Sequence, residues 1–268
     1  MTTCTLITAL YNINRENNGD GRKWSEYLEW FASTLQINLP MAIFIPAELH
    51  DFVIINRPSN LMDITYIKIM EFQDIPFYKY YSIIKNILDS DIYKQKIKDP
   101  NRVECKLPEY NIIQYSKFGW LKQVVDSNPF NSSHFFWIDA GISRFIDIKA
   151  NRTLNNTLNN NSNNNSNKLI IQHNYLLQNY KIDENYLWDS QCLMCGTMFG
   201  GSQVAVHTFN KIVEETFVHY LVKNNWVNNE QILLAYLYAQ NNELFHIVLN
   251  DTNRHLMLFD YILPISSD

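Results

Sequence analysis

Short apolar runs alternate with longer amphipathic segments along most of the chain. The apolar runs predict buried strands at 5–11, 41–45, 52–55, 134–139, 169–172, 193–199, 244–249 and 256–262. Apolar residues at helical spacing predict helices at 23–35, 75–98, 115–125, 204–222 and 229–240. This alternation is typical of an α/β fold in which helices flank a mostly parallel central sheet.

Polar segments follow two of these strands, at 8–15 and 139–144. Because ligands of such sheets bind beyond the carboxyl ends of the strands, we expect both segments at one functional edge. The sequence contains no G-x-G-x-x-G after the first strand and no G-x-x-x-x-G-K-[ST]. A Rossmann dinucleotide site and a P-loop are therefore not expected.

Composition narrows the class of protein further. The 268 residues are 46% hydrophobic, which excludes global disorder, and no apolar run approaches the ~20 residues of a membrane span. With 22 basic and 27 acidic residues the net charge is −5, so a nucleic-acid partner is not expected. The four cysteines fit no zinc signature and are expected to be reduced. The amino-terminal residues lack a signal-peptide pattern, which favours a cytoplasmic location.

An asparagine-rich tract occupies residues 151–168, where ten of the 18 residues are Asn. It offers no apolar face, so we expect a disordered insert between two strands of a single domain spanning 1–268.

The sharpest chemical feature is Asp139, which ends an apolar strand and is followed by Ala140 and Gly141. Small residues let a phosphate approach the backbone, and a carboxylate with phosphate oxygens suits Mg²⁺ or Mn²⁺. The alternative is an aspartate that caps the turn after the strand. Farther along, Gly200 and Gly201 follow a predicted strand and permit either close approach of a sugar or a tight turn.

A carboxylate and an amide, Glu230 and Gln231, open the helix predicted at 229–240. They could cap that helix, which is worth only about 0.3–1 kcal/mol. Alternatively, they face a sugar ring at its anomeric carbon.

Taken in order, these pieces resemble the HtrL/YibB-like family of GT-A-type glycosyltransferases. The segments that carry the resemblance are Leu6-Ile-Thr-Ala, Trp137-Ile-Asp-Ala-Gly-Ile, Phe199-Gly-Gly-Ser, Glu230-Gln-Ile-Leu-Leu and Leu258-Phe-Asp-Tyr. Two positions depart from the pattern: Gly141 replaces the second Asp of the Asp-x-Asp motif, and Asn229 replaces an acidic residue.

The resemblance implies a GT-A-like domain that transfers a hexose, glucose in our interpretation, from a UDP-sugar with Mn²⁺ or Mg²⁺. Catalysis would involve Glu230 and Gln231, and Lys117 would open a helix and reach the donor diphosphate. Asp139 would bind the metal, and a ligand near the C-terminus, His255 or alternatively Asp251, would complete its site. The expected donor-binding residues are Thr8, Ala9, Tyr11, Arg15, Lys117, Asp139, Ala140, Gly141, Gly200 and Gly201.

The acceptor is expected to be a glycan or a glycosylated hydroxylysine of a collagen-like protein. That expectation comes from a composition, rich in Asn, Ile, Lys and Tyr, that resembles AT-rich giant-virus or amoebal genes. The alternatives are a non-catalytic module that binds carbohydrate or protein through its many aromatic residues, and a nucleotidyltransferase that uses the same sheet edge.

Overall fold

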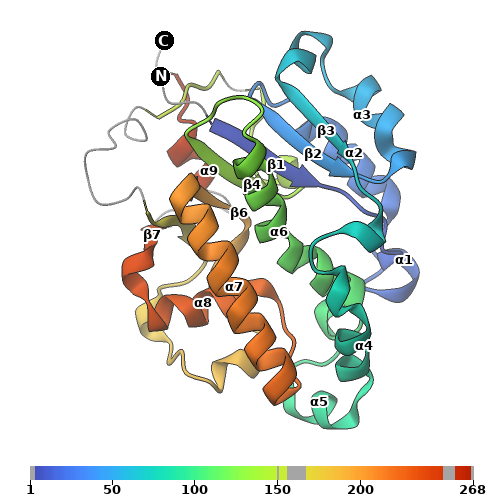
Figure 1. Cartoon of the computed structure of the whole chain (residues 1–268), viewed down its shortest axis with the longest axis vertical. Coiled ribbons are helices and arrows are strands. Elements are labelled where there is room, and N and C mark those ends of the chain that lie inside the picture. Colours follow the sequence, from blue (N-terminus) through green and yellow to red (C-terminus); the bar gives the residue numbers. More distant parts are fainter. Residues whose placement is uncertain (1–3, 150, 156–166, 250–256, 267–268) are drawn as a thin grey trace.

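A seven-stranded sheet lies at the centre of the fold (Figure 1). The structure is a computed structural model, and it describes residues 4–149, 151–155, 167–249 and 257–266. In the sheet the strands follow the order β3-β2-β1-β4-β6-β5-β7. Their bounds are β1 (Cys4–Ala9), β2 (Met41–Ile45), β3 (Thr65–Ile69), β4 (His134–Ile138), β5 (Leu169–His173), β6 (Met194–Ser202) and β7 (Phe245–Val248).

The sheet is parallel except at one strand. β1 pairs in parallel with both β2 and β4, β2 does so with β3, and β5 does so with β7. β6 is antiparallel to β4 and β5. Every residue of β1, β2, β4 and β5 is buried, as expected of strands covered on both faces. The predicted α/β class with a mostly parallel central sheet is confirmed.

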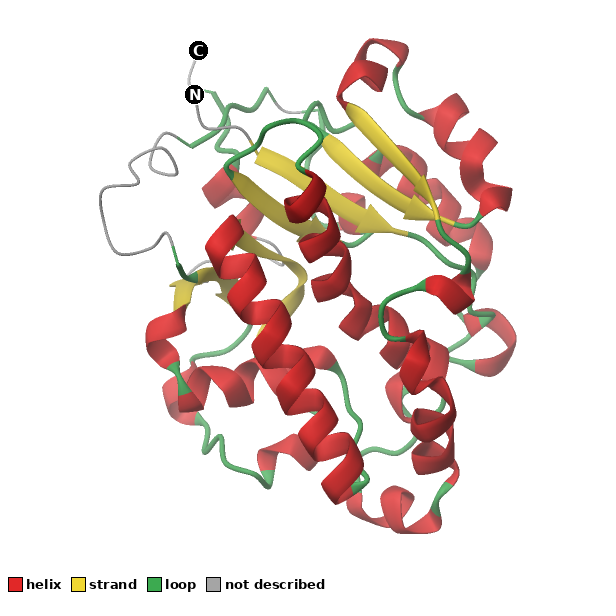
Figure 2. Ribbon diagram, viewed as in Figure 1, coloured by secondary structure: helices red, strands yellow, loops and turns green. Residues whose placement is uncertain are grey.

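Helices cover both faces of the sheet (Figure 2). One apolar layer contains buried side chains of α4, α5, α6, α7 and α8, and the other contains those of α2, α3 and α9. The helices are α1 (Arg15–Asn18), α2 (Trp24–Thr34), α3 (His50–Asn56), α4 (Tyr81–Asp89), α5 (Asp91–Lys96), α6 (Pro108–Ser127), α7 (Gln203–Asn224), α8 (Glu230–Gln240) and α9 (Met257–Ile262).

Local sequence explains the bounds of the helices that matter for the site. α6 has Pro108 at its first position, where the missing N–H costs nothing, and it ends at Asn128 in the left-handed conformation. α8 is capped by Asn229, whose side-chain oxygen accepts a hydrogen bond from Gln231 N at 3.0 Å. The beginning of α8 is therefore fixed by the residue directly before it.

Several predicted elements differ in the structure. The runs predicted as strands at 52–55 and 256–262 are helical where the structure describes them, in α3 and over 257–262 in α9. A short apolar run fits a buried strand or a buried helix turn equally well. The helix predicted at 115–125 begins seven positions earlier, at Pro108. β6 extends to Ser202, so Gly200 and Gly201 lie within a strand and not after one.

Part of the asparagine-rich tract is tied to the end of the chain. Arg152 Nη1 donates to Asp260 Oδ1 at 2.6 Å and to the Leu263 carbonyl at 2.8 Å. Asn155 Nδ2 donates to the Tyr261 carbonyl at 2.7 Å. The expectation of a disordered insert over all of 151–168 is therefore wrong for its first five residues, while 156–166 lie outside the described residues.

The described helices were also compared with the requirements of a membrane span. None of them combines the length and the apolar character needed to cross a bilayer.

Candidate active site

A cleft of about 290 Å³ opens at the edge of the sheet where β1 and β4 end. This volume is near the lower end of the range for small-molecule sites, ~300–1,000 Å³. Its walls come from the segment after β1, from α2, from the amino-terminal half of α6, from the segment after β4 and from the start of α8. This edge is the one that the sequence predicted for a ligand.

Asp139 projects from the end of β4 and is held from two sides. Its backbone N–H donates to the Thr197 carbonyl of β6 at 2.9 Å. Its Oδ1 accepts hydrogen bonds from Trp137 Nε1 at 2.8 Å and from Lys117 Nζ at 3.1 Å. The side chain remains 32% exposed, so a fixed carboxylate borders the cleft.

Lys117 lies between two carboxylates. Its ammonium group is 2.9 Å from Glu230 Oε1 and 3.1 Å from Asp139 Oδ1, and it donates to the Gly196 carbonyl at 3.0 Å. Burial lowers the pKa of Lys117, but Asp139 and Glu230 outweigh that effect and raise the pKa above its ordinary value. Lys117 is therefore a permanent cation whose three N–H donors all have partners.

The helix position of Lys117 differs from the prediction. Because α6 begins at Pro108, Lys117 lies in the middle of the helix and not at its start. Its long side chain still reaches the cleft, together with Tyr110 and Gln114 from the same helix. Spacings of three and four residues place these three side chains on one face of α6.

Glu230 lies behind Lys117 and not on the wall of the cleft. Its side chain is 1% exposed, and only its neighbour Gln231 lines the cleft. Burial raises the pKa of Glu230 to about 7, although the ion pair with Lys117 acts to lower it. Its Oε2 has no hydrogen-bond partner among the described residues. A Cβ at position 196 would collide with Glu230 Oε1, so Gly196 leaves the room that this carboxylate fills.

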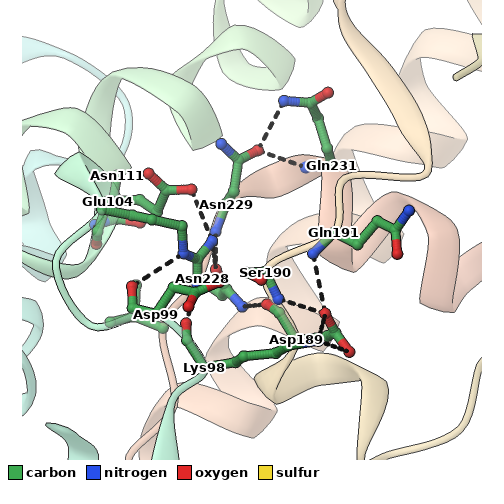
Figure 3. A network of polar contacts seen from close by, with 12 residues as sticks. Lys98, Asp99, Glu104, Asn111, Asp189, Ser190, Gln191, Asn228, Asn229 and Gln231 are labelled. Carbon is green, nitrogen blue, oxygen red and sulfur yellow. Dashed lines mark hydrogen bonds and ion pairs between the residues drawn. The ribbon is translucent and has the colours of Figure 1, made fainter.

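A polar network fixes the segment that leads into α8 (Figure 3). Asn228 Nδ2 donates to the Leu187 and Asp189 carbonyls at 2.9 and 2.8 Å, and its Oδ1 accepts from the Asn229 backbone. Arg102 Nη1 donates to Asn228 Oδ1 at 3.3 Å. Because these contacts are buried or half-buried, they set the position of α8 and hence of Glu230.

The structure brings together most of the predicted site residues but not all. The predicted residues that line the cleft are Ala9, Tyr11, Arg15, Lys117, Asp139, Ala140, Gly141 and Gln231.

Three predicted donor-binding residues lie elsewhere. Thr8 is wholly buried within β1. Gly200 and Gly201 pair with Phe136 and Phe135. Because β6 is antiparallel, Gly200 lies beside the middle of β4 and Gly201 lies nearer its amino-terminal end, away from the edge where Asp139 lies.

The second predicted metal ligand, His255 or alternatively Asp251, lies outside the described residues. Within the described part of the chain, no group of three or more His, Cys, Asp or Glu side chains could hold a metal ion. Of the two predicted metal ligands, Asp139 is therefore the one that the structure describes.

Several cleft residues were missed or given no role. Arg22 and Arg144 line the cleft, as do Trp24, Tyr27 and Tyr110. Arg144 falls within the polar segment 139–144 that was placed at this edge, and this was the available signal. Arg22 was missed although its contacts with Asp20, Tyr27 and Trp30 are local, because a single arginine in a polar segment carries no distinctive signal.

Two enzymes are among the solved structures that resemble this chain. Mouse xyloside xylosyltransferase 1, in its apo form, is 6% identical, with a TM-score of 0.44 over 92% of this chain and 84% of that one. The 4-diphosphocytidyl-2C-methyl-D-erythritol synthase of Anaerococcus prevotii is 11% identical, with a TM-score of 0.32 over 94% of this chain and 91% of that one. No curated protein matches the chain by sequence.

The sequence also matches one family model over residues 2–260, nearly the whole chain. That model is described as "Bacterial protein of unknown function (HtrL_YibB)". The chain therefore belongs to the HtrL_YibB family.

Proposed function

We propose that this protein is a metal-dependent, GT-A-like glycosyltransferase that takes a hexose from a UDP-sugar bound in the cleft. The observation that carries the proposal is Asp139, a fixed and partly exposed carboxylate at the end of a central parallel strand, beside a buried cation. Ligands of open α/β sheets bind at this edge. A diphosphate there would meet Asp139 through a divalent ion, with the positive charge of Lys117 next to that carboxylate.

The residues present fit a magnesium- or manganese-type ion with one protein ligand. Such ions are commonly held by one or two carboxylates together with substrate phosphates and water. Asp139 supplies one carboxylate, with its Oδ1 fixed by Trp137 and Lys117. When bound, the ion would supply Lewis-acid stabilisation of the departing diphosphate. His255 remains the predicted second ligand.

The other residues of the cleft would orient the donor. The end of β1 and the segment after it, with Ala9, Tyr11 and Arg15, would hold the base and phosphates. Gln231 would face the sugar, because it lines the cleft at the start of α8. Glu230 would act through Lys117, which it holds against Asp139. Fixed charges that need no reorganisation lower the barrier where negative charge develops on the leaving group.

The donor sugar and the acceptor are proposals that rest on a composition resembling AT-rich giant-virus or amoebal genes. Glucose is the proposed sugar, and a glycan or a glycosylated hydroxylysine on a collagen-like protein is the proposed acceptor. Neither assignment is needed for the test of the reaction class.

The test is release of UDP from a panel of UDP-sugars, with Mn²⁺ and with EDTA, followed by identification of the sugar product. We expect Mn²⁺-dependent UDP release and a free or transferred hexose. Release of pyrophosphate with a nucleotide-linked product would instead indicate a nucleotidyltransferase. If glycans stabilise the folded protein against heat and UDP with Mn²⁺ does not, the protein would be a binding module.

A further inference from the structure

Three arginine side chains line the cleft near Asp139 and come from separate segments. Arg15 belongs to α1, Arg22 follows α1, and Arg144 ends the short helix after β4. We refer to Arg15, Arg22 and Arg144 as the arginine cradle.

The three arginines of the cradle contact aromatic rings and only a few hydrogen-bond acceptors. Arg15 donates to the Tyr27 hydroxyl at 2.6 Å, and Arg22 donates to the same hydroxyl at 3.4 Å. The guanidinium carbons of Arg22 and Arg144 lie 5.9 and 4.3 Å from the Trp30 ring centroid. Arg144 Nε donates to the Gly141 carbonyl at 3.0 Å. Stacking of this kind fixes a guanidinium group while its outer N–H donors remain available.

Negative charge within the cradle is scarce. Asp20 pairs with Arg15 at 2.6 Å and reaches Arg22 only at 3.9 Å. Among the residues that the structure describes, no carboxylate forms an ion pair with Arg144. Partial burial and then the charge of Arg22 lower the pKa of Arg144, whereas Asp139 acts to raise it. The guanidinium groups of Arg22 and Arg144 therefore repel each other, and a bound anion would relieve that repulsion.

The cradle lies next to the proposed metal-binding carboxylate. Gly141, whose carbonyl accepts from Arg144, is two positions after Asp139. A Cβ on Gly141 would lie 3.3 Å from Arg144 Nε and 3.4 Å from the Trp30 ring, so this glycine admits both side chains. An anion beside Asp139 thus has guanidinium groups within reach on the side formed by α2.

We propose that Arg22 and Arg144 bind the diphosphate of the donor directly, so that the donor retains affinity for the cleft without a metal ion. This inference rests on the proposed function and adds two residues to it. The planar fork of a guanidinium group matches phosphate oxygens with two parallel hydrogen bonds, which a lysine cannot provide. Lys117 cannot take this part, because its donors are already used by Glu230, Asp139 and Gly196.

The experiment is calorimetric titration in EDTA with three probes: inorganic pyrophosphate, UDP and uridine. The variants are Arg22→Gln and Arg144→Gln, and the control is Lys211→Gln, which removes a cation that is 74% exposed on α7. We expect each arginine variant to weaken pyrophosphate and UDP by about 10- to 100-fold, since a charged hydrogen bond is lost. The arginine variants should bind uridine as the wild type does. The Lys211→Gln variant should bind all three probes with wild-type affinity.

Three outcomes would overturn the inference. The first is equal pyrophosphate affinity in wild type and both arginine variants. The second is weakened pyrophosphate binding with unchanged UDP affinity, which would assign the cradle to an anionic group of the acceptor. The third is no binding of either anion by the wild type in EDTA. Sugar transfer that depends on Mn²⁺ would support the proposed function in all three cases. If transfer is absent while pyrophosphate binding still depends on the arginines, the proposed function is rejected and diphosphate binding by the arginines is not.

Discussion

Lys117 and Glu230 form an ion pair of 2.9 Å that is almost completely removed from solvent, with side-chain exposures of 2% and 1%. The pair joins α6 to α8 across 113 positions of the sequence. A buried ion pair is poor evidence of stability, because desolvation offsets much of the attraction. A carboxylate with one unpartnered oxygen is costlier still, so we interpret the pair as a device that positions Lys117 at the cleft.

Replacing Lys117 should reveal the desolvation cost of the buried carboxylate. In Lys117→Met, Glu230 and Asp139 lose their shared partner, and we predict a loss of about 3–5 kcal/mol of unfolding free energy at pH 8. The loss should be smaller at pH 5.5, where Glu230 can take up a proton. Urea unfolding at the two pH values measures both numbers.

The control for that variant lies on the same helix. Lys122 pairs with Asp126 on the surface of α6 and is 43% exposed, so Lys122→Met should cost at most about 1 kcal/mol. An equal loss from both variants, or one that does not depend on pH, would show that Lys117 contributes only packing.

Glu230 should also leave a signature in the stability of the wild type. Its pKa is about 7 in the folded chain and ordinarily 4.5, so between these values the folded state retains a proton that the unfolded state releases. Its contribution to stability is therefore present below pH 4.5 and is lost as the pH rises through about 7. Glu230→Gln cannot titrate, so its unfolding free energy should fall less than that of the wild type between pH 5 and 8. Parallel curves for the two proteins would refute this assignment.

The central fold was predictable because its strands are continuous apolar runs. β1, β2 and β4 were each expected, and the carboxylate after β4 was located correctly. The direction of β6 was not predictable, since apolar content carries no information on strand polarity, and Gly200 and Gly201 were misplaced for that reason.

Site residues were predictable only where a local segment carried the signal. Asp139 and Gly141 share such a segment. The contact of Lys117 with Glu230 joins distant parts of the chain through packing. No pattern in a single sequence reports such contacts.

Kinetics should separate the two residues that open α8. Gln231 lines the cleft, so Gln231→Ala should lower turnover by about tenfold and leave UDP affinity nearly unchanged. Glu230→Gln should lower turnover and Mn²⁺-dependent UDP affinity together, because it acts through Lys117 and Asp139. The readouts are kcat, KM and the inhibition constant of UDP. Lowered turnover with normal UDP affinity in Glu230→Gln would place that carboxylate at the sugar, as the sequence first suggested.

The asparagine-rich tract should divide into a dispensable part and a required part. Replacing 156–166 with a short Gly/Ser linker should change Tm by no more than about 2 °C, since this stretch is almost entirely polar. Arg152→Ala should cost about 1–3 kcal/mol, because it removes hydrogen bonds to Asp260 and Leu263. Thermal unfolding measures both, and a large loss from the linker variant would show that the tract packs on the domain.

The central claim is that Asp139 holds the divalent ion that bridges the donor diphosphate, and calorimetric titration of UDP with and without Mn²⁺ tests it most directly. The wild type should bind UDP more tightly with Mn²⁺. Asp139→Asn should lose most of that increment while keeping its fold, as seen by circular dichroism, because an amide keeps the shape but not the charge of the ligand. An unchanged Mn²⁺ increment in Asp139→Asn, or a wild type that does not bind UDP with Mn²⁺, would contradict the account.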